Sequence, residues 1–225
     1  GLFKAIFVTG GPGSGKDVII REAIAEQKSV EISVSHAFDL LADKKQLAEK
    51  TNDYRREAIR NRGPLIINGP ADHQNEILWV REELEELGYD CMMVFVDTTN
   101  EASQSRNEKL TKMIAESVRY DKWMTSQTGK MTYRHSFKNF ESLDNSGSLS
   151  NIEEDITDIY YKINHFIDNK TYFEEAYRWM ETHGKLNTND SITVLVKENN
   201  HVEKTNIFIQ RLKESRAPKL VRGTG

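Results

Sequence analysis

Cysteine is almost absent from the sequence, and so are the features that mark secreted and membrane proteins. The one cysteine, Cys91, lies inside the apolar run CMMVFV, which predicts a buried thiol in a reducing compartment and excludes a disulfide framework. No run approaches the roughly 18 consecutive apolar residues of a membrane span. No secretory signal or myristoylation motif opens the sequence, and it holds no internal repeat. These absences predict a cytoplasmic protein without a membrane partner.

Net charge is also small, but the charged residues are unevenly distributed. The 225 residues carry a net charge of -4, with 37% hydrophobic and 29% charged residues, which is ordinary for one globular core with a small appendage. Residues 106–138 nevertheless hold eight basic and three acidic residues, and residues 43–62 hold seven and four. Each basic segment is either a solvated helix face or a contact for nucleic acid.

The stretch FVTGGPGSGKDVII resembles a phosphate-binding loop, in which Gly, four residues, Gly-Lys and Ser or Thr follow one another. Gly10, Gly15 and Lys16 fit this pattern. The apolar run KAIFV before the loop predicts a buried strand, and DVIIREAIAEQ after it predicts a helix with an apolar face. Strand, glycine loop and helix is the context in which backbone N–H groups bind phosphates. The predicted nucleotide-binding residues here are Gly11, Pro12, Gly13, Ser14, Gly15, Lys16, Asp17 and Val18.

Asp17 is the departure from the pattern, because it stands where a hydroxyl would hold Mg²⁺. A carboxylate is a hard oxygen ligand that also suits Mg²⁺. Asp17 is therefore a predicted metal ligand, for a site that uses ATP and Mg²⁺. The alternative is that it acts only as a negative charge at a helix N-terminus.

Strand-like runs alternate with helical patterns along most of the chain. The runs are KAIFV (4–8), VEISV (30–34), PLIIN (64–68), CMMVFV (91–96) and FESL (140–143). This alternation predicts a five-stranded parallel sheet covered by helices, in three α/β/α layers. Together with the glycine loop, it resembles the P-loop NTPase fold of the kinase type. We expect this domain to span residues 1–168. Residues 169–225 then form a small α+β extension with a helix at 171–184, a strand at 191–196 and a basic tail.

The end of the third predicted strand argues against a hydrolase. Motor and switch ATPases place an Asp there to hold the metal, whereas this strand ends in Asn68 and the first acid is Asp72. A kinase instead needs an acid near the acceptor and a mobile basic segment over the phosphates. Asp72 remains either a secondary Mg²⁺ residue or the N-cap of the helix that starts near Gln74.

Two motifs together resemble the polynucleotide-kinase and zeta-toxin group of P-loop kinases. They are the loop GPGSGK (11–16) and the sequence RNEK (106–109) after the fourth predicted strand. The phage-type deoxynucleoside monophosphate kinases are similar in carrying Gly-Lys-Asp in the loop. LDNSGSL (143–149) also resembles the turn that lies beside the adenine in many such kinases, which implies that Asn145 and Gly147 bind the nucleotide.

The predicted catalytic residues are Lys16, Asp39, Arg106 and Arg119. Arg106 begins the segment that closes over the γ-phosphate in this group, which is called the lid. The group's general base directly follows the second strand, whereas here the first acid after the predicted strand is Asp39, with His36 one helical turn before it. Either residue is a candidate base, and a surface position on the helix is equally compatible with Asp39.

The predicted activity is transfer of the γ-phosphate of ATP to a hydroxyl of nucleic acid, either a DNA 5′-hydroxyl or a hydroxylated base. In residues 106–138, which we call the lid region, basic residues alternate with Tyr120, Trp123, Tyr133 and Phe137, as suits phosphate contacts and base stacking. Core packing is the other explanation of these aromatic residues. The alternative functions are a nucleoside monophosphate kinase and a nucleotide-dependent regulatory NTPase.

Overall fold

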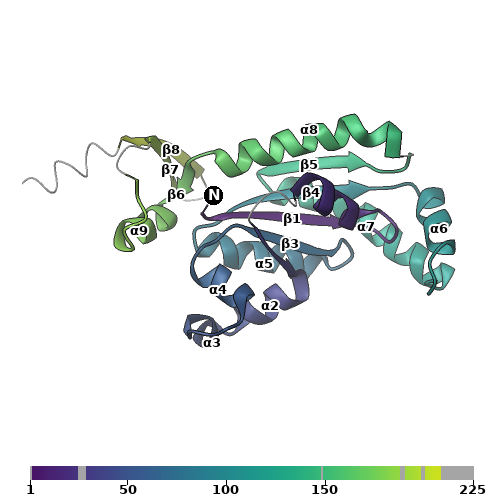
Figure 1. Cartoon of the computed structure of the whole chain (residues 1–225), viewed down its shortest axis with the longest axis horizontal. Helices are drawn as coiled ribbons and strands as arrows, with labels where there is room; N and C mark the ends of the chain where they lie inside the picture. The colour runs from purple at the N-terminus through teal and green to yellow at the C-terminus, as the bar shows by residue number, and fades with distance from the viewer. Residues whose placement is uncertain (1, 25–28, 148, 188–190, 199–200, 209–225) are drawn as a thin grey trace, which may run out of the picture. The chain divides into compact units, whose positions relative to one another are not determined.

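The structure, a computed structural model, describes residues 2–24, 29–147, 149–187, 191–198 and 201–208 (Figure 1). The described residues form two compact units that divide after Asn169. The first unit holds the predicted phosphate loop and both basic segments.

The elements of the first unit alternate between strand and helix along the chain. They are β1 (Lys4–Gly10), α1 (Lys16–Ile19), the π-helical η1 (Ile20–Ile24), β2 (Val30–Ser33), α2 (Val34–Ala42), α3 (Lys44–Ala48), α4 (Tyr54–Arg60), β3 (Leu65–Pro70), α5 (Gln74–Glu86), β4 (Asp90–Asp97), α6 (Asn100–Glu108), α7 (Glu116–Ser136), β5 (Asn139–Asp144) and α8 (Leu149–Asp168).

The five strands form one parallel sheet in the order β2-β3-β1-β4-β5. The predicted five-stranded parallel α/β fold is therefore confirmed. The chain passes from β1 through β2 to β3 on one side, and then crosses to β4 and β5 on the other. The loop after β1 leaves the sheet at this change of direction, and in parallel α/β sheets ligands bind in the crevice outside such a point.

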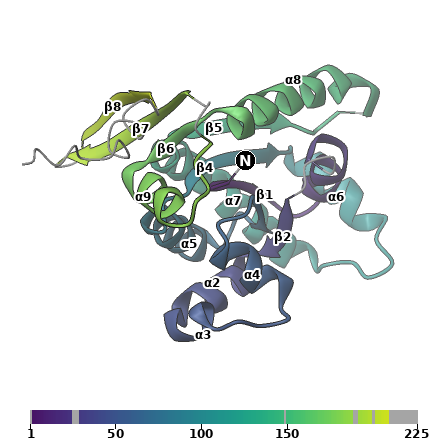
Figure 2. The ribbon, with the colours of Figure 1, turned by 60° about the vertical axis from the view of Figure 1, so that its left-hand side comes forward.

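One face of the sheet is covered by α1, η1 and α8 (Figures 1 and 2). Alternate residues of β1 and β4 point to this face, because side chains alternate along a strand. The buried cluster comprises Ile6, Val8, Ile19, Ile20, Ile66, Met92, Val94, Val96, Leu143, Ile159, Ile163, Phe166 and Ile167. In the helix after the loop it is Ile19 and Ile20 that are buried, while Val18 is only partly covered.

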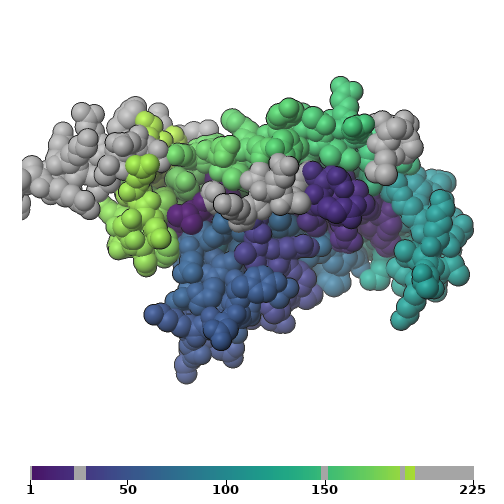
Figure 3. Space-filling view, viewed as in Figure 1, coloured from purple at the N-terminus to yellow at the C-terminus, as the bar shows by residue number. Residues whose placement is uncertain are grey.

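The other face is covered by α2, α5 and α7. Phe7 of β1 meets Phe137 at a ring-centroid distance of 5.1 Å, and Phe95 of β4 meets Tyr133 at 6.2 Å. Both partners are buried, so the core-packing explanation holds for Tyr133 and Phe137. In the space-filling view the residues of α2, α3 and α4 project as one lobe from this unit (Figure 3).

No loop separates β2 from α2. The strand was expected to include Val34, but Val34 begins the helix because the Ser33 hydroxyl caps it by accepting the N–H of His36 at 3.3 Å. The cap is a favourable N-terminal arrangement for a helix. The chain therefore turns at Ser33, and the next acid, Asp39, lies on a helix rather than at a strand end.

The second unit consists of a three-stranded sheet and one helix. Its elements are β6 (Thr171–Phe173), α9 (Glu174–Thr182), β7 (Ser191–Glu198) and β8 (His201–Phe208), with β6 parallel and β8 antiparallel to β7. The expected helix at 171–184 is wrong in its first turn, because residues 171–173 pair with β7 instead. Gly184, with a φ of 62°, follows the helix as predicted. The basic tail, 216–225, lies outside the described residues.

Across the described part of the chain, no helix combines the length and hydropathy that crossing a membrane requires.

Candidate active site

The predicted phosphate-binding loop is a tight turn between β1 and α1. Gly13 and Gly15 adopt left-handed conformations, with φ of 68° and 81°. Residues that carry a Cβ rarely adopt this conformation. The N–H of Ser14 donates to the carbonyl of Gly11 at 3.1 Å and closes the loop, and Gly15 caps α1. The Ser14 side chain is buried and the Lys16 side chain is 25% exposed.

Three successive carbonyls of this loop accept hydrogen bonds from side chains outside it. Ser103 Oγ donates to Pro12 at 2.6 Å, and Arg106 donates to Gly13 at 2.8 Å. Asn145 Nδ2 donates to the carbonyl of Ser14 at 2.7 Å. The loop is thus fixed from α6 and from the end of β5.

Arg106 lies between the loop and the turn after β5. Besides the Gly13 carbonyl, its guanidinium donates to the carbonyl of Asn145 at 2.5 Å and to that of Gly147 at 3.5 Å. The three predicted residues Arg106, Asn145 and Gly147 are therefore brought together beside the glycine loop. In this arrangement Arg106 is bound to main-chain carbonyls.

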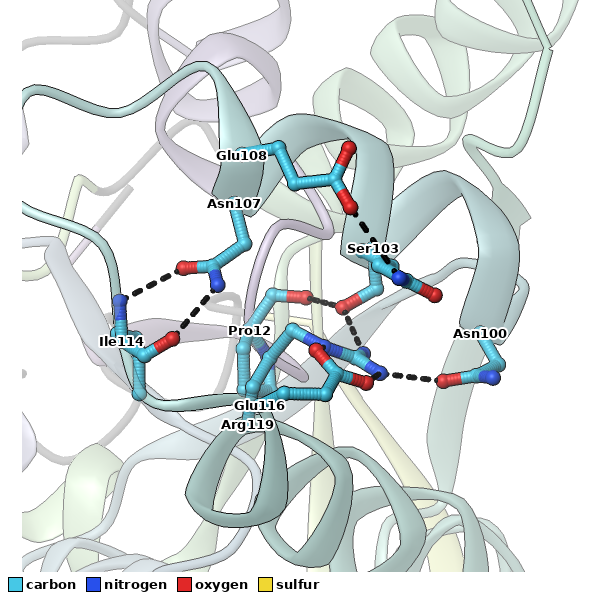
Figure 4. A network of polar contacts seen from close by, with 9 residues as sticks. Pro12, Asn100, Ser103, Asn107, Glu108, Ile114, Glu116 and Arg119 are labelled. Atoms are coloured by element: carbon cyan, nitrogen blue, oxygen red, sulfur yellow. Dashed lines mark hydrogen bonds and ion pairs between the residues drawn. The ribbon is translucent and has the colours of Figure 1, made fainter.

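Arg119 is fully buried on α7, and its guanidinium is surrounded by acceptors (Figure 4). It donates to Ser103 Oγ at 2.8 Å, to Asn100 Oδ1 at 2.6 Å and to both carboxylate oxygens of Glu116. The Glu116 hydrogen bonds raise the pKa of Arg119. The sequence predicted Arg119 as a catalytic residue, and in the structure its guanidinium supports Ser103.

Asp17 and Asn68 lie at the mouth of the loop. The Asp17 carboxylate is 3.7 Å from Lys16 Nζ, accepts a hydrogen bond from Asn68 Nδ2 at 3.4 Å, and is 76% exposed. The same Asn68 amide donates to Glu31 Oε1 at 2.9 Å. Asn68 therefore links the loop carboxylate to a second carboxylate on β2.

These residues fit a magnesium ion that is carried mainly by the nucleotide. Among the described residues no group of three or more His, Cys, Asp and Glu side chains could hold a metal. The exposed Asp17 carboxylate supplies one hard oxygen ligand, and Mg²⁺ commonly combines one or two carboxylates with waters and phosphate oxygens. The fit thus depends on Asp17 and on bound phosphates.

Asp72 is engaged elsewhere. Its carboxylate accepts a hydrogen bond from Lys122 of α7 at 3.1 Å. The alternative N-cap role is wrong, because the cap residue of α5 is His73 and it makes no side-chain cap bond. The ion pair joins the end of β3 to α7 and neutralises one of the basic residues of the lid region.

A cavity of about 530 Å³ opens at the carboxyl end of β2. It is lined by Glu31, Ser33, His36, Tyr54 and Arg55. Arg55 stacks over the Tyr54 ring at 4.6 Å from its centroid, and its Nε donates to the Glu31 carbonyl at 3.4 Å. The cavity thus combines a carboxylate, an imidazole, an exposed aromatic ring and a cation.

Glu31 is the acid that sequence reasoning missed. It lies inside β2 rather than after it, so a search for an acid at the strand end passes over it. The alternation in VEISV was the available signal, because it places Glu31 and Ser33 on one side of the strand and Ile32 on the other. The predicted base Asp39 is exposed on α2 and does not line the cavity, whereas His36 does, 4.0 Å from Asp53.

The lid region uses half of its basic residues and most of its aromatic residues internally. Lys130 pairs with Asp97 at 2.6 Å, and Trp123 Nε1 donates to the Thr98 carbonyl at 2.8 Å. Tyr120, by contrast, is 40% exposed. The exposed cations of this region are Lys109, Lys112, Arg134 and Lys138.

No family model and no curated protein matches the sequence. Among solved structures it is similar to a gluconokinase from Sinorhizobium meliloti 1021, with 15% identity, a TM-score of 0.43, and coverage of 72% of this chain and 94% of that one. It is also similar to a deoxyadenosine kinase from M. mycoides with bound dCTP, with 16% identity, a TM-score of 0.44, and coverage of 71% and 98%. A shikimate kinase from Bacteroides thetaiotaomicron gives 11% identity, a TM-score of 0.44, and the same coverage of 71% and 98%. At such identities the likeness gives no information about a substrate.

Proposed function

We propose that the protein is an ATP-dependent phosphotransferase whose acceptor is a hydroxyl group bound in the cavity beside β2. The observation that carries the proposal is the position of Asn68. Its amide joins Asp17 of the glycine loop to Glu31 of the cavity, at 3.4 and 2.9 Å. A phosphate held by the loop and a molecule held in the cavity would therefore meet at this residue.

The loop side supplies the charge stabilisation that phosphoryl transfer requires. Backbone N–H groups of the loop and the ammonium of Lys16 would hold the β- and γ-phosphates. Bound Mg²⁺ would neutralise charge on those phosphates, with Asp17 as its protein ligand.

On the cavity side, Glu31 is the candidate general base. Its carboxylate is fixed by Asn68 and faces the cavity, so it can accept the proton of a hydroxyl placed there. A phosphate acceptor would instead meet the carboxylate of Glu31, which repels an anion, whereas the charge of Asp17 would be offset by Mg²⁺. This charge argument favours a hydroxyl acceptor over a nucleoside monophosphate that receives the phosphoryl group on its own phosphate.

At the outer part of the cavity, Tyr54 and Arg55 suit a nucleotide unit. Tyr54 is 57% exposed and its ring can stack on a base, and the guanidinium of Arg55 can bind an anionic group. Such a unit occurs both in free nucleotides and within nucleic acid. The chemistry of the cavity is the same for both sources, and the assay separates them.

The test is transfer of label from ATP with a labelled γ-phosphate to a panel of acceptors. The panel holds nucleosides, nucleoside monophosphates, oligonucleotides with a 5′-hydroxyl, and DNA with a hydroxymethylated base. We expect label on a hydroxyl of at least one acceptor. Release of inorganic phosphate alone with every acceptor would instead favour a regulatory NTPase.

Glu31→Gln and Asp39→Asn form a matched pair for the base. Both replace a carboxylate by its amide, but only the first residue lines the cavity. We expect Glu31→Gln to lower kcat by about 10²-fold or more, as loss of a general base does, and Asp39→Asn to have little effect. The reverse result would return the base to α2.

A further inference from the structure

The carbonyls of Pro12, Gly13 and Ser14 are held by three side chains from two parts of the first unit. The donors are Ser103 and Arg106 of α6, and Asn145 after β5, at 2.6, 2.8 and 2.7 Å. Ser103 and Asn145 are themselves buried. These are therefore well-anchored donors that meet three consecutive peptide groups.

The direction of the Ser103 hydroxyl is set by Arg119. A guanidinium can only donate, and a hydroxyl has a single proton. Because Arg119 donates to Ser103 Oγ at 2.8 Å, the Ser103 proton remains available for the carbonyl of Pro12. Glu116 and Asn100 hold the same guanidinium from other sides (Figure 4). A buried cation thus orients a hydroxyl that in turn holds the loop.

Holding the carbonyls also directs the N–H groups. The C=O and the N–H of a trans peptide point in opposite directions. With the carbonyls of Pro12 and Ser14 held by outside donors, the N–H groups of Gly13 and Gly15 point away from those donors. Where backbone N–H groups converge, they form an anion-binding concavity.

Two glycines make this arrangement possible. A Cβ on Gly13 would lie 3.0 Å from the carbonyl oxygen of Ser103, and a Cβ on Gly15 would collide with the amide of Asn145. Side chains at either position would therefore push the donors away. The loop glycines serve the approach of the donors as well as the backbone conformation.

We infer that Ser103, Arg106 and Asn145, with Arg119 behind Ser103, hold the glycine loop in its phosphate-binding shape before the nucleotide arrives. We call these four residues the loop clamp. They act as positioning residues, and the inference rests on the proposed function in requiring that the loop binds a nucleotide. It assigns Arg119 and the Asn145 side chain to the loop itself, rather than to the γ-phosphate and the adenine.

The test is calorimetric binding of two probes to the full chain, ATP and inorganic tripolyphosphate, which has phosphates but no base. Loss of one hydrogen bond of the clamp by Ser103→Ala or Asn145→Ala is expected to weaken the binding of both probes by a similar factor, about tenfold. Ser103→Ala removes one hydroxyl only, so it keeps the test available if Asn145→Ala fails to fold. In steady-state assays the same variants should raise the KM for ATP and leave the acceptor KM unchanged.

Asn139→Ala is the matched control. Asn139 lies at the start of β5, at the opposite end of the strand from Asn145, and its amide donates to Asp90 at 3.3 Å. It should lose a hydrogen bond without any change in the affinity for either probe.

Three outcomes would overturn the inference. Folded Ser103→Ala and Asn145→Ala proteins that bind both probes normally would remove the clamp and leave the proposed function intact. Weaker binding of ATP alone in Asn145→Ala would assign Asn145 to the base. Wild-type protein that binds neither probe would overturn the proposed function, and the clamp with it.

Discussion

The ammonium of Lys122 lies 3.1 Å from the carboxylate of Asp72 and ties helix α7 to the end of β3. From the sequence the first residue was a candidate contact for nucleic acid and the second a candidate residue of the Mg²⁺ site. Instead each neutralises the other, and the Asp72 side chain is only 14% exposed. The pair therefore joins α7 to the segment that follows β3.

A double-mutant cycle measures this pair. Asp72→Asn and Lys122→Ala should each lower the free energy of unfolding by about 0.5–1 kcal/mol, the upper part of the range for partly exposed ion pairs. The double variant should lose less than the sum, because the two residues share one interaction. Denaturant unfolding is the measurement, and strict additivity would show that the pair contributes nothing.

Lys16→Ala should abolish phosphoryl transfer while the protein stays folded. The ammonium belongs to the loop that would hold the β- and γ-phosphates, and a preorganised charge of this kind contributes about 10²-fold or more to rate. Transfer assays together with a thermal unfolding curve check this. Normal turnover by the folded variant would remove the phosphate site from the glycine loop.

Asp17 and Asp72 should differ in their response to magnesium. Asp17→Ala should raise the Mg²⁺ concentration needed for half-maximal activity, and Asp17→Ser should largely restore it, because a hydroxyl is also an oxygen ligand. Asp72→Asn should leave the Mg²⁺ titration unchanged, since its carboxylate is paired with Lys122. Identical titrations for Asp17→Ala and wild type would leave Asp17 as a helix N-terminal charge only.

The sequence predicted local features well and the partners of single side chains poorly. The loop from Gly10 to Lys16 and its flanking strand and helix are encoded by neighbouring residues, so a motif finds them. The residues that accept hydrogen bonds from Arg119 are at positions 100, 103 and 116, on two helices that only the folded chain brings together. Glu31 was missed for a similar reason, since its function depends on Asn68 of the neighbouring strand.

Low pH should weaken the hydrogen bonds that Arg119 donates to Glu116. Hydrogen bonds from Arg119 hold the pKa of Glu116 below its usual range. A depressed carboxylate pKa gives stability that is present above the unfolded value, about 4.3, and lost as pH falls through the folded value. The difference in melting temperature between wild type and Glu116→Gln should therefore be constant near neutral pH and shrink below about pH 4. A difference that persists at pH 2 would show that Glu116 acts through packing rather than charge.

Whether the acceptor nucleotide is free or part of a nucleic acid can be decided from the basic residues that contribute to acceptor binding. Lys122 and Lys130 form ion pairs with Asp72 and Asp97. Arg55 is a cation that lines the cavity itself. Arg55→Ala should raise the acceptor KM about tenfold or more whether the nucleotide is free or part of a chain, because a charged hydrogen bond contributes about 1.5–3 kcal/mol.

A polynucleotide would also cover exposed cations outside the cavity, whereas a free nucleotide has too few phosphates to reach them. Lys109, Lys112, Arg134 and Lys138 are exposed in the lid region. If the acceptor is nucleic acid, replacing them by Gln should weaken acceptor binding and reduce the salt dependence by roughly one slope unit for each phosphate group that the variant no longer binds. Measuring the acceptor KM from low to high salt decides the matter. A KM that is insensitive both to salt and to these four substitutions, yet still responds to Arg55→Ala, would exclude a polynucleotide and leave a single nucleotide in the cavity.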